Sequence, residues 1–177
     1  MMRKIFLTLL LCALILGCAR HPAYESRKKM REGYPPEILD HYAARTIRPG
    51  EIWRIYLRIR DSDCDMTYVV ADLWQAGVGP YAASYTPIKE TGCREIAGYL
   101  ALNTPVDPGL IQDRLEAKVL VRDRRGHRSQ PITLILDFDT RSVEETPERW
   151  LQAASNRLGT IQIDVRSSQS FQGGLGF

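Results

Sequence analysis

Three aspartates alternate with other residues in one short segment of the chain. Asp61, Asp63 and Asp65 stand between two segments that are rich in apolar residues. Carboxylate oxygens grouped on one turn are the ligands that a hard cation such as Ca²⁺ takes in proteins. The alternative is a solvated turn in which the aspartates accept hydrogen bonds from their own backbone. We expect the solvated turn and keep Ca²⁺ as the one cofactor hypothesis.

Arginine and tyrosine alternate with apolar residues a little earlier in the chain. The even positions of this segment carry Arg54, Tyr56, Arg58 and Arg60. A strand would place these side chains together on the open face of a sheet. Arginine and tyrosine are enriched at protein interfaces, and guanidinium groups bind carboxylates. We expect a solvated face; the alternative is an interaction face formed by these four residues and Trp150.

The sequence carries no recognisable catalytic motif. It has no Gly-x-Ser-x-Gly, no His-Glu-x-x-His and no glycine-rich phosphate loop. Isolated carboxylates such as Glu51 and Asp137 are more often surface groups than acid or base catalysts. The sequence therefore predicts a protein that is not an enzyme and has no catalytic residues.

The composition excludes some classes of protein. The chain has 177 residues, of which 44% are hydrophobic and 25% are charged, as in an ordinary globular domain with extensions. Its net charge is +3, from 24 basic and 21 acidic residues. Removing Arg3 and Lys4 with a signal peptide leaves 22 basic against 21 acidic residues, a net charge of +1. This balance gives no reason to expect binding to nucleic acid.

The amino terminus has the three parts of a bacterial export signal. Arg3 and Lys4 precede an apolar run, Ile5–Leu16, that only Thr8 interrupts. Twelve helical residues rise about 18 Å, less than the ~30 Å hydrocarbon core of a bilayer, so the run is too short to span a membrane. It ends in Leu14-Ile15-Leu16-Gly17-Cys18, which resembles the lipobox of bacterial lipoproteins.

The lipobox resemblance implies a lipid anchor. In such proteins the chain is cut after the residue equivalent to Gly17, and Cys18 carries acyl chains such as palmitate. Each buried methylene contributes about 0.8 kcal/mol, so several chains together hold a protein in the bilayer. Ala19, and not Asp, follows the cysteine, which resembles the sorting pattern of outer-membrane lipoproteins. We expect an outer-membrane anchor with the body in the periplasm or at the cell surface. The alternative is an ordinary cleaved signal followed by a structural cysteine.

Cys64 and Cys93 are the only cysteines left after the signal segment and Cys18. A protein outside the cytoplasm meets an oxidising compartment, where such a pair favours a disulfide. A bridge that encloses about thirty residues could contribute ~3 kcal/mol to stability. The alternatives are free thiols or a redox or metal pair, which the long spacing disfavours.

Period-two alternation after Pro49-Gly50 predicts an all-β fold. We expect strands at 42–47, 53–60, 66–75, 81–88, 96–102, 115–121 and 132–138. Seven short strands without a long helical pattern favour an immunoglobulin-like Greek-key β-sandwich. The expected core consists of Trp53, Ile55, Leu57, Ile59, Leu115, Val119, Val121, Ile132, Leu134, Leu136 and Phe138.

Two local patterns resemble known β-sandwich modules. Asp123-Arg124-Arg125-Gly126-His127-Arg128-Ser129 resembles the last hairpin, Asp-x-x-Gly-Asn-x-Ser, of bacterial Ig-like and fibronectin-III-like repeats. The segment Asp61–Tyr68 resembles the Asp-x-Asp-Gly-Asp turn of cadherin-like and polycystic-kidney-disease-like modules, with Cys64 in place of Gly. The resemblance implies the sandwich fold, which domains of many functions share.

The carboxy-terminal part of the chain predicts a short helix and a strand. Thr146-Pro147-Glu148 is a favourable helix start, and Gly159 a favourable end. The apolar residues Trp150, Leu151, Ala154 and Leu158 would share one helix face. Alternation at Ile161, Ile163 and Val165 predicts a strand. We expect both elements to pack on the sandwich, with partner binding as the alternative.

These observations combine into one functional prediction. The predicted parts are a signal peptide (1–17), the lipidated cysteine and polar tether (18–40), the Ig-like sandwich (41–139), a helix–strand extension (140–166) and a disordered tail (167–177). The predicted function is a lipid-anchored, non-enzymatic module that binds or supports an envelope protein assembly. A carbohydrate- or Ca²⁺-binding envelope module ranks second, and an envelope hydrolase third.

Overall fold

Alternating side chains direct most of the chain into strands. In strand β3 (Ile52–Asp61), Trp53, Ile55, Leu57 and Ile59 are buried. The computed structural model describes residues 33–89, 94–141 and 145–172, which fall in one compact unit. The predicted signal peptide, Cys18 and most of the predicted tether lie outside the described residues. No helix in these described ranges is long and apolar enough to cross a bilayer.

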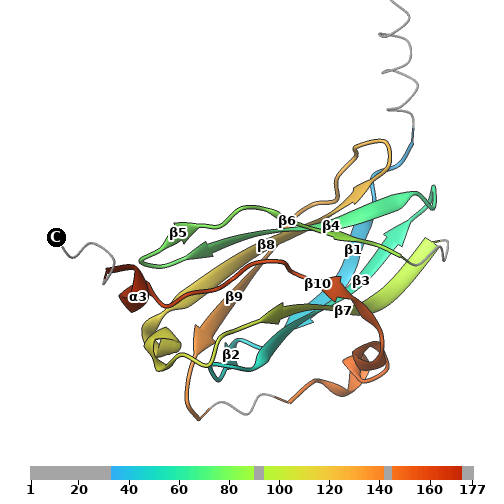
Figure 1. The fold of residues 1–177 in the computed structure, drawn as a ribbon. Helices are drawn as coiled ribbons and strands as arrows, with labels where there is room; N and C mark the ends of the chain where they lie inside the picture. The colour runs from blue at the N-terminus through green and yellow to red at the C-terminus, as the bar shows by residue number, and fades with distance from the viewer. Residues whose placement is uncertain (1–32, 90–93, 142–144, 173–177) are drawn as a thin grey trace, which may run out of the picture. The chain divides into compact units, whose positions relative to one another are not determined.

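The strands form two sheets that pack face to face (Figure 1). Sheet A has the order β1 (Glu37–Ala43), β3, β7 (Arg94–Asn103) and β10 (Arg157–Thr160). Sheet B has the order β2 (Thr46–Ile47), β9 (Ile132–Phe138), β8 (Arg114–Asp123), β4 (Met66–Gln75) and β5 (Gly79–Pro80), with β6 (Ser84–Pro87) also paired to β4. A short 3-10 helix, η1 (Pro108–Gln112), connects β7 to β8.

The path of the chain is that of an immunoglobulin-like Greek-key sandwich. The chain crosses from β3 in sheet A to β4 in sheet B, returns to sheet A at β7, and crosses back to form β8 and β9. The neighbouring pairs β1–β3, β3–β7, β4–β8 and β8–β9 are antiparallel, whereas β2 runs parallel to β9. The predicted fold class is confirmed.

The predicted strands and core agree closely with the structure in residues 52–138. The limits of β4 and β9 are those predicted. The predicted core is buried except for Ile132 and Leu134, which are partly buried and pack against it. The sandwich begins earlier than the predicted boundary at residue 41, because β1 starts at Glu37 and pairs with β3 over most of that strand's length.

The predicted carboxy-terminal helix is wrong. Two separate 3-10 turns, η2 (Glu148–Trp150) and η3 (Ala153–Ser155), take its place. No side chain caps either turn, so the favourable start at Pro147 does not propagate into a helix. Tertiary contacts of Trp150 and Leu158, which are both buried, outweigh the helical periodicity.

The predicted strand at Ile161–Val165 is also wrong. Strand β10 ends at Thr160 and runs parallel to β7, and the backbone then leaves the sheet. Residues 168–172, predicted to be disordered, form the short helix α3 (Ser168–Gln172). The rest of the predicted tail, residues 173–177, lies outside the described residues.

Residues 157–167, here called the closing segment, fill the open side between β6 and β7 (Figure 1). The Ile161 amide donates to the Ala101 carbonyl of sheet A at 2.9 Å. The next amide, that of Gln162, donates to the Ser84 hydroxyl of sheet B at 2.9 Å. The side chains that this path buries in the core are Leu158, Ile161 and Val165. The closing segment therefore completes the hydrophobic core by bonding to both sheets in turn.

Two glycines allow the closing segment to approach the strands. A Cβ on Gly98 of β7 would lie 2.6 Å from the carbonyl oxygen of Asn156. A Cβ on Gly159 would overlap the methyl group of Thr86 in β6. Side chains at either position would push the segment away from the sandwich.

A buried polar cluster fastens the end of the closing segment. The Asp113 carboxylate accepts hydrogen bonds from the Ser168 amide at 2.8 Å, the Ser168 hydroxyl at 2.5 Å and the Gln75 side chain at 2.8 Å. The Gln75 amide group also donates to the Arg166 carbonyl at 2.6 Å. Because Asp113 and Gln75 are buried, these bonds satisfy groups that would otherwise be costly to desolvate.

Truncation of Ile161 tests the role of the closing segment. Ile161 is 2% exposed and lies in the main core. We expect Ile161→Ala to lower the free energy of unfolding by about 2–4 kcal/mol, because a cavity replaces its buried methyl groups. The matched control is Leu151→Ala: Leu151 is 58% exposed, and a change below about 0.5 kcal/mol is expected there. Equal urea midpoints for the two variants would contradict the packing described above.

Candidate functional site

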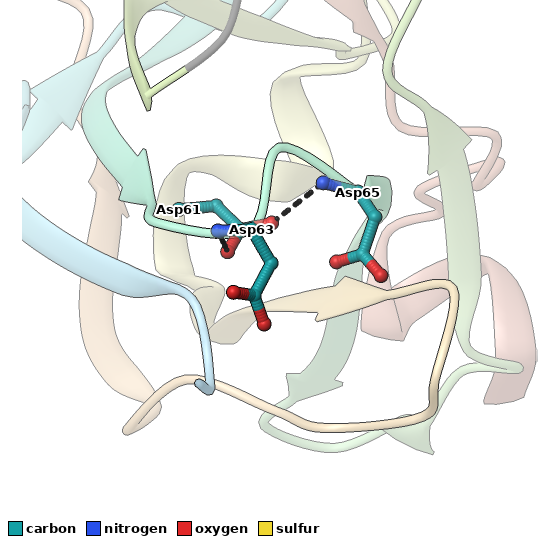
Figure 2. Close-up of side chains that lie close together, drawn as sticks. All are labelled: Asp61, Asp63 and Asp65. Atoms are coloured by element: carbon teal, nitrogen blue, oxygen red, sulfur yellow. Dashed lines mark hydrogen bonds between the residues drawn. The ribbon is translucent and has the colours of Figure 1, made fainter. Parts of the chain in front are cut away.

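The three aspartates form a turn that binds its own backbone. The side chain of Asp61 accepts hydrogen bonds from the amides of Asp63 at 3.1 Å and Asp65 at 2.9 Å (Figure 2). One carboxylate oxygen from each aspartate lies within 4.8 Å of the others. Cys64, inside the turn, has a φ of 59°, which explains why related turns carry glycine there. The predicted bonding to the backbone is confirmed, but the expectation of a solvated turn is wrong: Asp61 is 1% exposed, and the side chains of Asp63 and Asp65 are only 19% and 15% exposed.

Arg125 provides the positive charge that this carboxylate group requires. Its guanidinium lies 3.1 Å from the carboxylate of Asp63 and 3.3 Å from that of Asp65. The carboxylate of Asp63 also accepts a hydrogen bond from the Tyr34 amide at 2.8 Å. The turn thereby joins the start of the described chain to the β8–β9 hairpin.

The same residues allow the Ca²⁺ hypothesis to be tested against the structure. Three carboxylates fit a hard cation, and Asp65 Oδ1 is buried with no hydrogen-bond partner among the described residues. However, Ca²⁺ would have to displace Arg125, whose guanidinium already contacts two of the three carboxylates. The arrangement therefore favours a structural ion-pair cluster over a calcium site.

Burial raises the pKa of Asp65 above its ordinary value. The charges of Asp123 and Asp61 raise it further, while the guanidinium of Arg125 acts in the opposite direction. Asp123 is itself buried, and its carboxylate contacts His127 through the backbone amide at 2.8 Å and through Nδ1 at 2.6 Å. The hairpin thus adds a fourth carboxylate to the cluster.

The predicted disulfide between Cys64 and Cys93 stays a prediction. Strand β7 begins at Arg94, directly opposite Asp61, so it starts at the end of sheet A where Cys64 lies. Cys93, which precedes Arg94 in the sequence, lies outside the described residues.

The predicted interaction face of sheet A is only partly open. Tyr56 is 1% exposed and Trp150 is 3% exposed, and their ring centroids lie 5.7 Å apart. The prediction that Tyr56 lies on an open face is wrong because η2 places Trp150 over it. The expected packing of Trp150 on the sandwich is confirmed. The side chains of the three predicted arginines lie on the outer face of sheet A. Arg54 lies over the ring of Tyr99. Arg60 forms an ion pair with Glu37, and Arg58 lies near Glu95.

A hollow of about 690 Å³ lies beside this aromatic cluster, on the outer face of sheet A. We call it the sheet A hollow; its lining residues are Asp40, Arg58, Glu95, Ala97, Arg149, Trp150, Gln152, Ala153, Ser155 and Asn156. Of the predicted residues, the structure brings Arg58 and Trp150 together here, while Arg54 and Arg60 do not line it. Strand alternation could have identified Glu95, whereas the lining residues from η2 and η3 other than Trp150 had no signal in the sequence.

The charges of the sheet A hollow are only loosely paired. The distance from Arg149 to Asp40 is 3.7 Å, and that from Arg58 to Glu95 is also 3.7 Å. Both distances exceed an ordinary hydrogen bond, so each group keeps capacity to bind a ligand. The indole nitrogen of Trp150 is buried and has no hydrogen-bond partner among the described residues. The hollow therefore presents donors and acceptors side by side, as recognition of a polar chain segment requires.

Comparisons with known proteins give only distant likenesses. No protein-family model and no curated protein matches the sequence. The chain is similar to the sporulation control protein Spo0M of Bacillus subtilis, at 9% identity and a TM-score of 0.41, over 60% of this chain and 50% of that one. It is also similar to the CARDB domain of a Pyrococcus furiosus protein in complex with di-metal ions, at 10% identity and a TM-score of 0.29, over 59% of this chain and 90% of that one. The chain thus spans half of Spo0M, and neither likeness bears on function.

Replacement of Arg125 tests the structural role of the aspartate cluster. We expect Arg125→Ala to lower stability by about 1 kcal/mol, because the carboxylates of Asp63 and Asp65 then repel each other without a cation between them. Ca²⁺ should raise the melting temperature of this variant and leave that of the parent unchanged. Arg124→Ala, on the same hairpin, is the control and should respond to Ca²⁺ like the parent. A parent that Ca²⁺ stabilises as strongly as the variant would contradict this account.

The pKa of Asp65 leads to a prediction about pH. Because the folded state holds the Asp65 proton more tightly than the unfolded state, stability falls as the pH rises from the ordinary value of 3.8 through the raised one. Asp65→Asn removes this ionisation, so the variant should gain stability relative to the parent as the pH rises through that window. Urea midpoints at several pH values measure the difference. Parallel curves for variant and parent would contradict the prediction.

Proposed function

We propose that this chain is a lipid-anchored, non-enzymatic interaction module of the bacterial envelope. Its Ig-like sandwich would be held at the outer membrane by acylated Cys18, with the body in the periplasm or at the cell surface. The sheet A hollow would bind a polar segment of another envelope protein. The observation that carries the proposal is this hollow, with its two loosely paired arginines.

The chemistry of the hollow supports binding rather than catalysis. Its lining contains one hydroxyl, that of Ser155, and no histidine, cysteine or lysine. A nucleophile would need a base within hydrogen-bond distance, and among the described residues the Ser155 hydroxyl bonds only to the carbonyl of Gln152. The half-exposed charges of Arg58 and Glu95 also differ from the desolvated groups of most active sites.

The lipobox-like amino terminus supports the proposed anchor. About fifteen residues separate Cys18 from Gly33, where the described structure begins, and even a fully extended tether of this length reaches only about 50 Å. A body on such a tether stays near the membrane surface. A Cys64–Cys93 disulfide would be consistent with that compartment.

The partner should carry both signs of charge. Arg58 and Arg149 would bind carboxylates or carbonyl oxygens, and Asp40 and Glu95 would bind ammonium, guanidinium or amide groups. A protein segment offers both kinds of group within a short length. A phospholipid surface of one sign would instead be repelled by one half of the hollow.

Photo-crosslinking of the lipidated chain tests this function. A photoreactive residue at position 152, an exposed residue of the lining, should give an adduct with one envelope protein in cells of the source organism. Arg58→Glu should abolish the adduct, because the altered charge would repel Glu95 and the partner's carboxylates. The matched control Lys118→Glu, on the opposite sheet, should retain it. Cys18→Ser should release the chain from membranes and change its electrophoretic mobility.

The outcomes separate the two parts of the proposal. An unchanged membrane fraction and mobility for Cys18→Ser would overturn the lipid anchor. An adduct that survives Arg58→Glu, or no adduct in the lipidated parent, would overturn the sheet A hollow as the binding site.

A further inference from the structure

Exposed aromatic side chains gather on the outer face of sheet B, which the proposed function does not use. Tyr68 and Trp74 project outward from β4, and Tyr85 projects outward from β6. Trp74 is 47% exposed, in contrast to Trp53 and Trp150, which are buried. Exposed rings that share one face of a sheet mark a binding surface more often than scattered ones do.

Strand register orders the groups on this face. Tyr85 lies opposite Val70, and its ring packs edge-on against that of Tyr68 at 6.2 Å between centroids. Trp74 lies six positions after Tyr68 along β4, a distance of about 20 Å. Between them, Asp72 lies directly opposite Lys118 of β8. The face therefore has aromatic rings at both ends and charged groups in the middle.

A hollow of about 370 Å³ adjoins Trp74. Its lining residues are Asp72, Leu73, Trp74, Pro80, Tyr81, Glu116 and Lys118. Three of these side chains, those of Asp72, Glu116 and Lys118, make no hydrogen bond or ion pair with any described residue. The ring of Trp74 thus lies beside two carboxylates that can accept hydrogen bonds and one ammonium group that can donate them.

An exposed aromatic ring beside charged side chains that make no bonds to described residues indicates which class of macromolecule can bind to this face. The cores of protein interfaces are depleted of lysine, glutamate and aspartate, whereas all three occupy the centre of this face. Asp72 and Glu116 balance Lys118 and Arg122, which lies opposite Tyr68, so the face has no excess of positive charge to attract nucleic acid, anionic lipid or acidic polysaccharide. A neutral sugar matches both features, because its ring has an apolar face of C–H groups and an edge of hydroxyls that donate and accept hydrogen bonds.

We propose that the outer face of sheet B binds a neutral polysaccharide. Trp74 stacks on one sugar ring, and the side chains of Asp72, Glu116 and Lys118 bond its hydroxyls. Tyr68 and Tyr85 contact sugars further along the same chain, since the distance from Trp74 exceeds the length of a single ring. This binding requires neither the lipid anchor nor the sheet A hollow.

Titration of the full chain with oligosaccharides tests the proposal. The probes are oligomers of N-acetylglucosamine and of β-linked glucose, added to the unlipidated Cys18→Ser chain in a calorimeter. Binding should also protect Trp74, the exposed one of the three tryptophans, from acrylamide quenching. We expect Trp74→Ala to weaken binding about tenfold or more, because the stacking surface is lost. Trp74→Tyr keeps a ring at this position and should retain most of the affinity.

Two further variants test whether the oligosaccharide extends along this face. Tyr68→Ala should weaken binding of long oligomers and leave that of a disaccharide unchanged. Tyr34→Ala removes an exposed ring outside this face and should change neither. Folding of each variant is checked by its urea midpoint. No heat and no protection with either oligomer series, or binding that Trp74→Ala leaves intact, would overturn the proposal. Loss of membrane fractionation or of the sheet A adduct would not affect it.

Discussion

The structure depends on the closing segment, because strands β6 and β7 leave one side of the core uncovered. Leu158, Ile161 and Val165 fill that side, and the backbone bonds first to sheet A and then to sheet B. To reach this position, the chain must first cross the outer face of sheet A. That crossing forms η2 and η3 and places Trp150 on Tyr56. The sheet A hollow is therefore a consequence of how the core is closed.

The aspartate cluster is held at the end of the sandwich by balanced charge. Asp61 orders the turn through backbone bonds, and Arg125 neutralises the carboxylates of Asp63 and Asp65. A turn of this kind resembles a calcium site in sequence, because both require carboxylates at alternate positions. What distinguishes them is a guanidinium from a hairpin about sixty residues away in the sequence. Such a partner is visible only once the fold is known.

The sequence predicted the secondary structure correctly where the local residue pattern matches the burial of the side chains. In β4 and β9, runs rich in strand-forming residues give both strands their correct limits, and every second side chain faces the core. Trp150 and Leu158 also fit a helical spacing, but each is buried by a separate contact with the sandwich, and the backbone between them forms only 3-10 turns. Tyr56 likewise fits the outward set of β3, yet it is covered by a residue far along the chain. Long-range covering of this kind leaves no periodic signal.

The two outer faces of the sandwich differ for a structural reason. Sheet A is covered in part by η2 and η3, which bring polar side chains such as Arg149 and Asn156 over its strands. Sheet B has no such covering among the described residues, and its rings at Tyr68, Trp74 and Tyr85 stay exposed. Because the outer faces of packed sheets point in opposite directions, ligands on them do not compete for space. If both proposed sites are occupied, one copy of the module would hold a protein segment and a glycan at the same time, and the proposed lipid anchor would keep both near the membrane.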